Sequence, residues 1–540
     1  KTTSEIPDTS LPKLDKTAPL NKFLIHGITG SGKTEIYAHL ARHFLQKGQQ
    51  VLILVPEISL TPQTVEYFES RLGFKAAVIH SRLSEGEKFK MWKDIKSNKK
   101  PLVIGSRSSI FSPFTNLGII IIDEEHELSY KQDQSPRYLT HTIAEKIQEL
   151  AQKHNANHII PIVLGSATPS IETAYKYKDS TIHLRERIGT ATLPDIKIVD
   201  MREEFKKGNK TIFSDELQDE ITKTLASGKQ AILFLNRRGS ASSIVCRDCG
   251  FKLTCPNCDI PMTYHARTLG KPVIICHHCG QIGKIPINCP NCQGLNIRFL
   301  GIGTERIEED TKKLFKSARV ARADKDTTSH KTSFEQIYSS FKKGEIDILI
   351  GTQMIAKGLH IPNVNLVGVV LADIGLNMPD FRTSERNFQL LTQVSGRAGR
   401  SNEKGKVIIQ TYTPDHFALQ STMNNDYDAF YQIERSQRGI LAYPPFVHLA
   451  KLSIENKIFQ KAKSKAEEIE TILKNLANKI SSQSPDLKSQ IIEITAYPAF
   501  ILKLYGKYRY RILIKARTNT AIQTILKSLD QKLLDEIKID

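Results

Sequence analysis

Short apolar runs alternate with amphipathic, helix-like stretches along most of the chain. Residues 50–55 (QVLILV), 117–123 (LGIIIID) and 162–166 (IVLGS) are strand-sized and apolar nearly throughout. A second series includes 230–235 (QAILFL) and 364–373 (VNLVGVVLAD). Strands that are apolar on both faces and separated by helices are typical of a parallel sheet covered on both sides. The pattern therefore predicts an α/β fold with two parallel-sheet domains.

Changes in composition and spacing predict further divisions. A polar stretch with Pro and Thr opens the chain and is interpreted as a tail or linker. A cysteine-rich segment interrupts the second α/β series, after which strands such as 297–300 (IRFL) are expected to resume the same sheet. The last part is Lys-rich and combines helix with strand, which predicts an α+β domain. The expected units are a tail (1–21), a first lobe (22–190), a second lobe in two parts (191–245 and 293–429), a Cys-rich insertion (246–292) and a C-terminal domain (430–540).

All eight cysteines lie in the Cys-rich insertion, as four C-x-x-C pairs. A two-residue spacer lets both thiolates face one tetrahedral metal, so the pairs predict two Cys₄ zinc sites. The segment is too poor in apolar residues to form a core alone, and bound metal would supply its folding energy. Disulfides are the alternative, but they suit small secreted domains. A redox C-x-x-C usually occurs singly, beside a βαβ unit. The candidate ligands are Cys246, Cys249, Cys255, Cys258, Cys276, Cys279, Cys289 and Cys292.

The overall charge is strongly basic. Lys and Arg number 76 against 57 Asp and Glu, which gives a formal net charge of +19. Such a balance indicates nucleic acid as the first candidate partner, an acidic membrane surface as the second, and a merely solvated basic surface as the alternative. The longest apolar runs fall far short of the roughly 20 residues that cross a bilayer. No secretory signal opens the chain, and because it does not begin with Met we expect a fragment or a processed form.

The segment 27–34 (GITGSGKT) fits the phosphate-loop pattern G-x-x-x-x-G-K-[ST]. It follows an apolar run and precedes a helical pattern, which is the context that this motif requires. Glycines let the backbone N–H groups turn towards the phosphates, the lysine adds charge to the β- and γ-phosphates, and the threonine hydroxyl ligates Mg²⁺. The predicted nucleotide-binding residues are Gly27, Thr29, Gly30, Ser31, Gly32, Lys33 and Thr34.

Two further segments complete a candidate catalytic centre. Asp123 and Glu124 end an apolar strand, where ligands sit in open α/β sheets. Asp123 is the candidate Mg²⁺ ligand and Glu124 the candidate for orienting or deprotonating the attacking water; a solvated turn is the alternative. The segment QVSGRAGR offers Gln393, Arg397 and Arg400. Arginines suit the charge that develops during phosphoryl transfer, although a basic turn facing solvent or DNA is also possible.

The order of these motifs resembles superfamily 2 helicases: GxTGSGKTE, DEEH, GSAT, GTQMIAKG and QxxGRAGR occur in sequence. Four C-x-x-C pairs inserted after FLNRRG narrow the match. So do four further segments, LVPEISLTPQT (54–64), SYKQ (129–132), DFRTSER (380–386) and YPPF (443–446). With them the chain resembles the PriA family (primosomal protein N′) of bacterial replication-restart helicases. The resemblance implies two RecA-like lobes, with ATP, Mg²⁺ and two Zn²⁺ as cofactors.

The resemblance also implies roles for individual residues. GKT and DEEH would bind and hydrolyse ATP, while Ser166 and Thr168 would couple hydrolysis to the DNA-binding face. Gln393, Arg397 and Arg400 would sense the γ-phosphate. Contacts to DNA and to the nucleotide cleft would come from Thr352, Gln353, Lys357 and Gly358. One zinc would be shared by the outer cysteine pairs, Cys246, Cys249, Cys289 and Cys292, and the other by the inner pairs, Cys255, Cys258, Cys276 and Cys279.

The function that the resemblance implies is ATP-dependent 3′→5′ unwinding at stalled or collapsed replication forks, followed by primosome assembly. Its partners would be forked and single-stranded DNA, single-stranded DNA-binding protein and other primosome proteins, at the nucleoid in the bacterial cytoplasm and without a membrane. Residues 507–511 (KYRYR) would receive the acidic tail of single-stranded DNA-binding protein, although Lys507 stands where the family has Arg. An ordinary exposed strand with alternating basic and aromatic residues is the alternative. The chain departs from the family pattern at further points. It has almost none of the family's N-terminal DNA-binding region, and it lacks the Gln segment that reads adenine, since no Gln precedes Gln46. Leu139 stands where the family often has His. A zinc-dependent fork-binding scaffold with uncoupled ATPase, or an RNA helicase, is the alternative.

Overall fold

The computed structural model describes residues 21–540 except 58–59, 82, 189–192, 237–241, 258–260, 266–272, 277–279, 301–302, 325–332, 357–362, 377, 379, 400–403 and 484–489. The first lobe holds a seven-stranded sheet in the order β3-β4-β2-β5-β8-β1-β9. Every pairing in it is parallel, as the apolar runs predict. The strands are β1 (Lys22–Gly27), β2 (Gln50–Leu54), β3 (Ala76–Ile79), β4 (Leu102–Gly105), β5 (Leu117–Asp123), β8 (Ile162–Ser166) and β9 (Thr181–Leu184).

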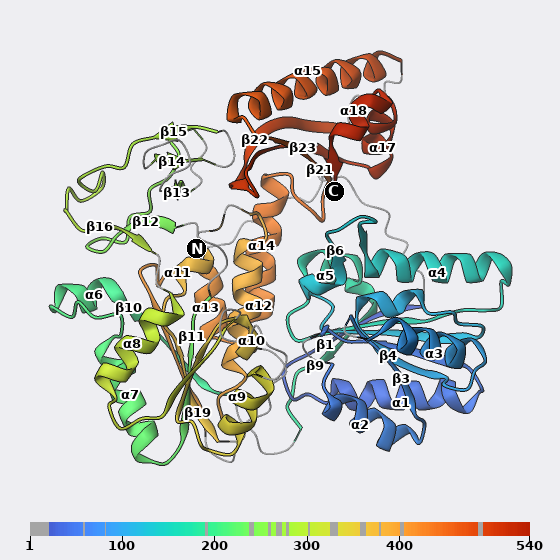
Figure 1. Cartoon of the computed structure of the whole chain (residues 1–540), viewed down its shortest axis with the longest axis horizontal. Coiled ribbons are helices and arrows are strands. Elements are labelled where there is room, and N and C mark those ends of the chain that lie inside the picture. Colours follow the sequence, from blue (N-terminus) through green and yellow to red (C-terminus); the bar gives the residue numbers. More distant parts are fainter. Residues whose placement is uncertain are drawn as a thin grey trace, which may run out of the picture.

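Helices cover both faces of this sheet. Two apolar clusters, one on each face, contain buried side chains from every strand except β9. The contribution of β9 is a partly buried leucine, Leu184. The helices at one face are α1 (Lys33–Gln46) and α2 (Pro62–Leu72), and α4 (Thr140–His154) lies on the other (Figure 1). The remaining helices of the lobe include α3 (Glu85–Lys96) and α5 (Ile171–Lys176). Because all strands run the same way, their carboxyl ends meet at one edge, where the candidate site lies.

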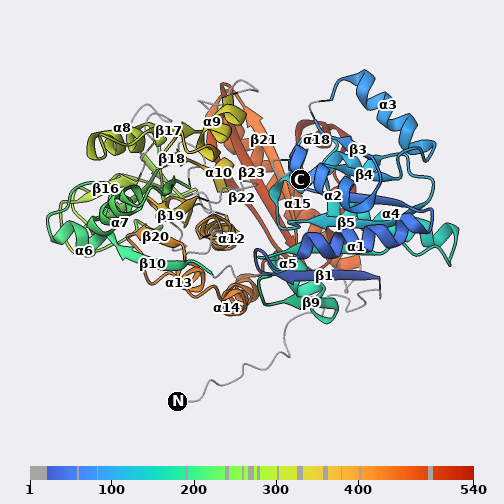
Figure 2. The ribbon, with the colours of Figure 1, turned by 90° about the horizontal axis from the view of Figure 1, so that it is seen from below.

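The second lobe repeats this architecture with six strands in the order β10-β20-β19-β11-β18-β17, again all parallel. The helix α12 (Thr383–Ser395) carries much of the lobe's core and is seen end-on between the two lobes in Figure 2. Two parallel-sheet lobes confirm the predicted fold class. The strands are β10 (Asp195–Asp200), β11 (Gln230–Phe234), β17 (Val320–Ala323), β18 (Ile348–Gly351), β19 (Val364–Val369) and β20 (Lys406–Thr411).

The Cys-rich insertion forms a separate antiparallel sheet in the order β15-β14-β13-β12-β16. One strand differs from the expectation: residues 297–300 pair antiparallel with β12 instead of joining the parallel sheet of the second lobe. The pairing closes the insertion at its base, because the chain must leave and re-enter the lobe at neighbouring points. The strands are β12 (Ser242–Cys246), β13 (Thr263–His265), β14 (Val273–Ile275), β15 (Ile282–Gly283) and β16 (Ile297–Leu300).

The C-terminal domain is a four-stranded sheet, β22-β23-β21-β24, covered by the long helix α15 (Phe459–Gln483). It lies above both lobes in Figure 1 and touches the insertion, where Val273 and Ile275 pack against Leu502. Helix α14 (Tyr427–Ile440) leads into it from the second lobe. Within the described residues, no helix has the length and apolar character that a membrane span requires. The strands are β21 (His448–Asn456), β22 (Ile491–Leu504), β23 (Lys507–Ala516) and β24 (Lys538–Ile539).

Candidate functional site

The segment 27–34 forms a tight loop between β1 and α1. Gly30 and Gly32 have φ values of 85° and 87°, a left-handed conformation that other residues rarely adopt. A Cβ on Gly27 would collide with the Ser31 hydroxyl, so the turn leaves no room for a side chain there. The N-cap of α1 is Gly32, which has no side chain to occupy the first amides of the helix. The loop and the helix N-terminus therefore offer N–H groups and a positive dipole end to an anion.

Lys33 points back into this loop. Its ammonium donates to the Gly27 carbonyl at 2.7 Å and approaches the Ile28 carbonyl at 3.5 Å. These carbonyls hold the lysine where the phosphates of a nucleotide are expected. Thr34 lies in the first turn of α1, directly after the loop. This is the position that the phosphate-loop motif assigns to the Mg²⁺ ligand.

Asp123 lies at the carboxyl end of β5, in the same sheet as the loop. Tyr37, on α1, donates its hydroxyl to Asp123 Oδ1 at 3.0 Å. Burial raises the pKa of the Asp123 carboxyl to about 6; the neighbouring Glu124 adds to this rise and Lys33 opposes it. A bound cation would stabilise the ionised form of a carboxylate whose pKa is raised. Asp123 and Thr34 both offer oxygen atoms, the ligands that Mg²⁺ prefers.

Glu124 adopts φ 48°, in the left-handed region, directly after the strand. Its Oε2 atom is buried and makes no hydrogen bond within the described part of the chain. The imidazole of His126 lies close by, with its Nδ1 3.7 Å from Glu124 Oε2. A carboxylate in a strained backbone conformation, with one oxygen that has no hydrogen-bond partner among the described residues, suits a group that accepts a hydrogen bond from water.

His126 joins the two lobes. Its Nδ1 lies 2.7 Å from the Ser166 hydroxyl in the first lobe, and its Nε2 lies 2.9 Å from the Gln393 side-chain amide in the second. The Ser166 hydroxyl also accepts the Thr168 N–H at 2.9 Å. The sequence identified His126 only as the last residue of the DEEH motif, without a role of its own. The structure makes it the connection between the candidate catalytic strand, the SAT segment and Gln393.

The segment that follows α12 reaches the phosphate loop from the second lobe at Gly396. The position that a Cβ on Gly396 would take lies 3.4 Å from the Thr29 hydroxyl. Arg397 is the next residue after Gly396 and is half-buried. Arg400, Lys357 and Gly358 lie outside the described residues.

Four cysteines come together at the base of the Cys-rich insertion. The sulfurs of Cys246, Cys249, Cys289 and Cys292 all lie within 4.8 Å of one another. Cys246 and Cys292 are 3.7 Å apart, as are Cys249 and Cys289. Zn–S bonds of about 2.3 Å in a tetrahedron place sulfurs roughly 3.8 Å apart, so this set fits one zinc ion and not a disulfide. It is also the outer set that the resemblance implied.

The inner cysteines are only partly described. Cys255 and Cys276 are fully buried in the small core of the insertion. Cys258 and Cys279 lie outside the described residues, so the second zinc site stays a prediction.

A buried ion cluster, which sequence reasoning missed, connects the lobes next to the site. Arg438, on α14, has a side chain 2% exposed and contacts carboxylates from three elements. Its guanidinium donates to Glu385 of the second lobe at 2.6 Å, to Glu434 of its own helix at 2.9 Å and to Glu172 of the first lobe at 3.2 Å. Glu385 also accepts the Ile171 N–H of the first lobe at 2.9 Å. Only the segment DFRTSER, noted for its resemblance, signalled part of this cluster.

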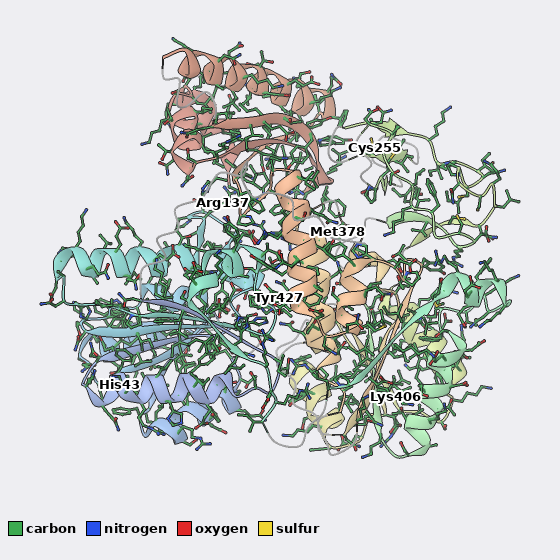
Figure 3. All side chains as sticks on the ribbon, turned by 180° about the vertical axis from the view of Figure 1, so that it is seen from behind. His43, Arg137, Cys255, Met378, Lys406 and Tyr427 are labelled. Carbon is green, nitrogen blue, oxygen red and sulfur yellow. The ribbon has the colours of Figure 1, made fainter. Side chains whose placement is uncertain are left out.

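A cavity of about 2090 Å³ opens where the two lobes and the C-terminal domain meet. Arg137 of the first lobe and Met378 of the second both line it, and Figure 3 shows them near this junction. Tyr427 lies deeper between the lobes in the same view, where its hydroxyl donates to the Pro169 carbonyl at 2.9 Å. Arg511 and Lys515 of β23 line the cavity from above. Arg382 and Arg386 of the second lobe also line it, so basic groups from all three units reach the junction, beside carboxylates such as Glu172 and Glu385.

Four family models match parts of the chain. Residues 11–171 match "Type III restriction enzyme, res subunit", and residues 274–402 match "Helicase conserved C-terminal domain". Residues 255–282 match "PriA DNA helicase Cys-rich region (CRR) domain". Residues 439–540 match "Primosomal protein N C-terminal domain".

Curated relatives named "Replication restart protein PriA" match nearly the whole chain. The Bacillus subtilis protein is 47% identical over 96% of this chain, and the match spans 62% of that protein. The Treponema pallidum protein is 39% identical over 96% of this chain and 74% of its own length. Among solved structures, RecG bound to a three-way DNA junction matches 78% of this chain and 44% of RecG, with 17% identity and a TM-score of 0.44.

The Rickettsia felis relative is 40% identical and is covered over 78% of its length. The chain spans about three-fifths of the Bacillus subtilis and Synechocystis relatives, 62% and 59% of their lengths. The Cys-rich match (255–282) begins before the helicase C-terminal match (274–402) and overlaps its start, and the C-terminal match (439–540) follows both. With identity of 39% to 40% over more than two thirds of two relatives, the chain belongs to the PriA family of replication restart proteins.

Proposed function

We propose that this chain is an ATP-dependent superfamily 2 DNA helicase that moves 3′→5′, acts at stalled or collapsed replication forks and initiates primosome assembly. The observation that carries the motor proposal is the contact between lobes at the phosphate loop. Gly396 lies against Thr29, and Gln393 reaches His126 at 2.9 Å. A nucleotide bound in this loop would therefore touch both lobes at once, and its hydrolysis would change how they fit together.

Each residue of the candidate site has a proposed role in hydrolysis. Lys33 exchanges its two carbonyl partners for the β- and γ-phosphates. Thr34 and Asp123 would hold Mg²⁺, which would supply positive charge against the phosphates. Glu124 orients the attacking water and accepts its proton through the open Oε2. Arg397 and Arg400 stabilise the negative charge that develops on the phosphoryl group.

His126 is proposed to transmit the state of the site. In the present arrangement the Gln393 amide donates to His126 Nε2, which leaves the Nδ1 hydrogen for the Ser166 hydroxyl. If phosphate release moves Gln393 away, His126 loses its hydrogen bond to the Gln393 amide. The hydrogen bonds that join His126 to Ser166, and Ser166 to Thr168, then change with it. This series of hydrogen bonds would couple hydrolysis to DNA binding. DNA is proposed to lie across the two lobes and the cavity beneath the C-terminal domain.

The proposed partners are forked and single-stranded DNA, single-stranded DNA-binding protein and other primosome proteins, at the nucleoid in the bacterial cytoplasm. Two tyrosines of residues 507–511 face inward: Tyr510 is buried in the domain core, and Tyr508 packs on Phe459. Lys507, Arg509 and Arg511 therefore occupy the opposite face of β23. This basic face supports the proposal that an acidic peptide tail binds there.

The motor proposal is tested by unwinding of a synthetic forked duplex. We expect strand separation that requires hydrolysable ATP, and ATPase activity that DNA stimulates more than RNA does. A non-hydrolysable ATP analogue serves as the control for binding alone. A protein that binds the fork and leaves its strands paired is a scaffold, and that result would reject the motor proposal.

Two zinc ions per chain are proposed, one on each cysteine set. Replacing Cys289 with serine should remove one zinc equivalent of about two, because a tetrahedral site does not retain its metal well with one thiolate lost. Elemental analysis of the purified chain measures the ratio, and Ile287→Ser is a matched control in the same segment, since Ile287 is 84% exposed. Wild-type protein without zinc, or with its cysteines in disulfides, would contradict the prediction.

A further inference from the structure

A short segment after β9 runs alongside the phosphate loop. β9 pairs with β1 as far as Gly27, opposite Leu184. The pairing then continues into the loop: Ile28 N–H donates to the Leu184 carbonyl at 3.2 Å, and Ile188 N–H donates to the Gly30 carbonyl at 3.0 Å. Residues 184–188 are thus fixed to the loop by its own backbone.

Two side chains of this segment lie directly over loop glycines. The Cγ, Cδ and Nε atoms of Arg187 are 3.8–3.9 Å from the position that a Cβ on Gly30 would take. A Cβ on Gly32 would overlap Ile188 Cδ1. Arg187 is half-buried, and burial lowers the pKa of its guanidinium. Ile188 is 70% exposed although it lies over the start of α1. An exposed apolar side chain next to a planar cation is a surface that a flat aromatic ligand can cover.

The sheet order shows which end of a nucleotide would meet this surface. β1 lies between β8 and β9, and β5 lies beyond β8. Asp123 and Ser166 end β5 and β8, so the residues assigned to phosphate chemistry stand on one side of β1. Arg187 and Ile188 follow β9 and stand on the other side. A nucleotide with its γ-phosphate towards Asp123 directs its nucleoside towards β9.

We propose that Arg187 and Ile188 form the subsite for the base and ribose of the nucleotide. Ile188 supplies an apolar face for the base, and the guanidinium of Arg187 stacks on the base or contacts the ribose. The inference rests on the proposed function for its ligand, a nucleoside triphosphate, and adds the residues that distinguish a nucleotide from bare polyphosphate.

The test measures binding without DNA or hydrolysis. ADP and inorganic tripolyphosphate are titrated into wild-type chain, Ile188→Ser and Arg187→Met by calorimetry. Methionine retains the aliphatic packing over Gly30 and loses the guanidinium. We expect each variant to bind ADP about tenfold more weakly than wild type, which is about 1.4 kcal/mol, with tripolyphosphate binding unchanged. Lys33→Ala should weaken both ligands, because it acts on phosphate.

Ile159→Ala is the matched control. Ile159 is 42% exposed in the same lobe and precedes β8, at the edge of the sheet opposite the loop. ADP binding within twofold of wild type in both variants would overturn the proposal, as would an equal loss for ADP and tripolyphosphate. A wild-type chain that binds ADP and hydrolyses no ATP would reject the motor and leave the subsite standing, whereas one that binds no ADP would reject both.

Discussion

Replacing Lys33 with alanine should lower the DNA-stimulated ATPase rate about 10²- to 10³-fold, the usual cost of removing one donor that stabilises charge in a transition state. Lys33 is held in the loop by the Gly27 carbonyl at 2.7 Å, so its ammonium needs little movement to meet a phosphate. The loop keeps its shape without it, because Gly30 and Gly32 and the pairing with residues 184–188 set the backbone. Steady-state ATP turnover with saturating forked DNA measures the loss.

Lys47→Ala is the matched control for this variant. Lys47 is exposed at the C-cap of α1, so the same charge is removed from the same helix at its far end. Its ATPase should stay within about twofold of wild type, and both variants should keep the thermal stability of the parent. A Lys33→Ala chain that still turns over ATP at a tenth of the wild-type rate or more would show that another cation supports the phosphates.

The sequence located the parts of the site whose signals are local. A phosphate loop needs glycines, Lys33 and Thr34 within eight residues, and Asp123 ends an unbroken apolar strand. Both patterns reflect constraints of one turn or one strand, so they can be read without knowing the tertiary structure. The parallel sheets were predictable for the same reason, since strands buried on both faces are apolar throughout.

Features that depend on contacts between distant segments were not predictable. The run 297–300 has the apolar character of a lobe strand, yet it pairs with β12, because the insertion needs a partner strand where the chain re-enters. The boundary placed at residue 430 falls inside α14, which runs on from Tyr427 to Ile440. Composition shifted there, but a helix that links two units does not end where composition changes.

Arg187 shows a different limit. It belongs to no motif, and its position over Gly30 follows from the extension of β9 along the loop. Arg438 is similar, because buried charges are rare and an arginine in an amphipathic helix is normally expected to be exposed. Its three carboxylates come from residues 172, 385 and 434, and only the packing of α14 between the lobes brings them together.

The Arg438 cluster leads to the second large expected effect. Replacing Arg438 with methionine leaves Glu172, Glu385 and Glu434 close together without the cation that contacts all three. Breaking a buried ion pair by removing one partner costs about 3–5 kcal/mol, since the remaining charge has lost both water and its counterion. Burial already raises the pKa of the Glu434 carboxyl to about 7, so part of this cost is met by protonation.

We expect the loss to appear at the junction between lobes. Hydrogen exchange of α5 and of the first turn of α12 should become about a hundredfold faster or more, because about 3 kcal/mol corresponds to that factor in the population of the separated state. Arg435→Met is the control: Arg435 lies one turn away on α14, 6.0 Å from the Tyr431 ring, and should change exchange little. Adding Glu385→Gln to Arg438→Met should restore part of the protection, since it removes one of the uncompensated charges. Unchanged exchange in Arg438→Met would mean that the packing of α14, and not this ion cluster, holds the lobes in the arrangement that brings Gly396 to Thr29.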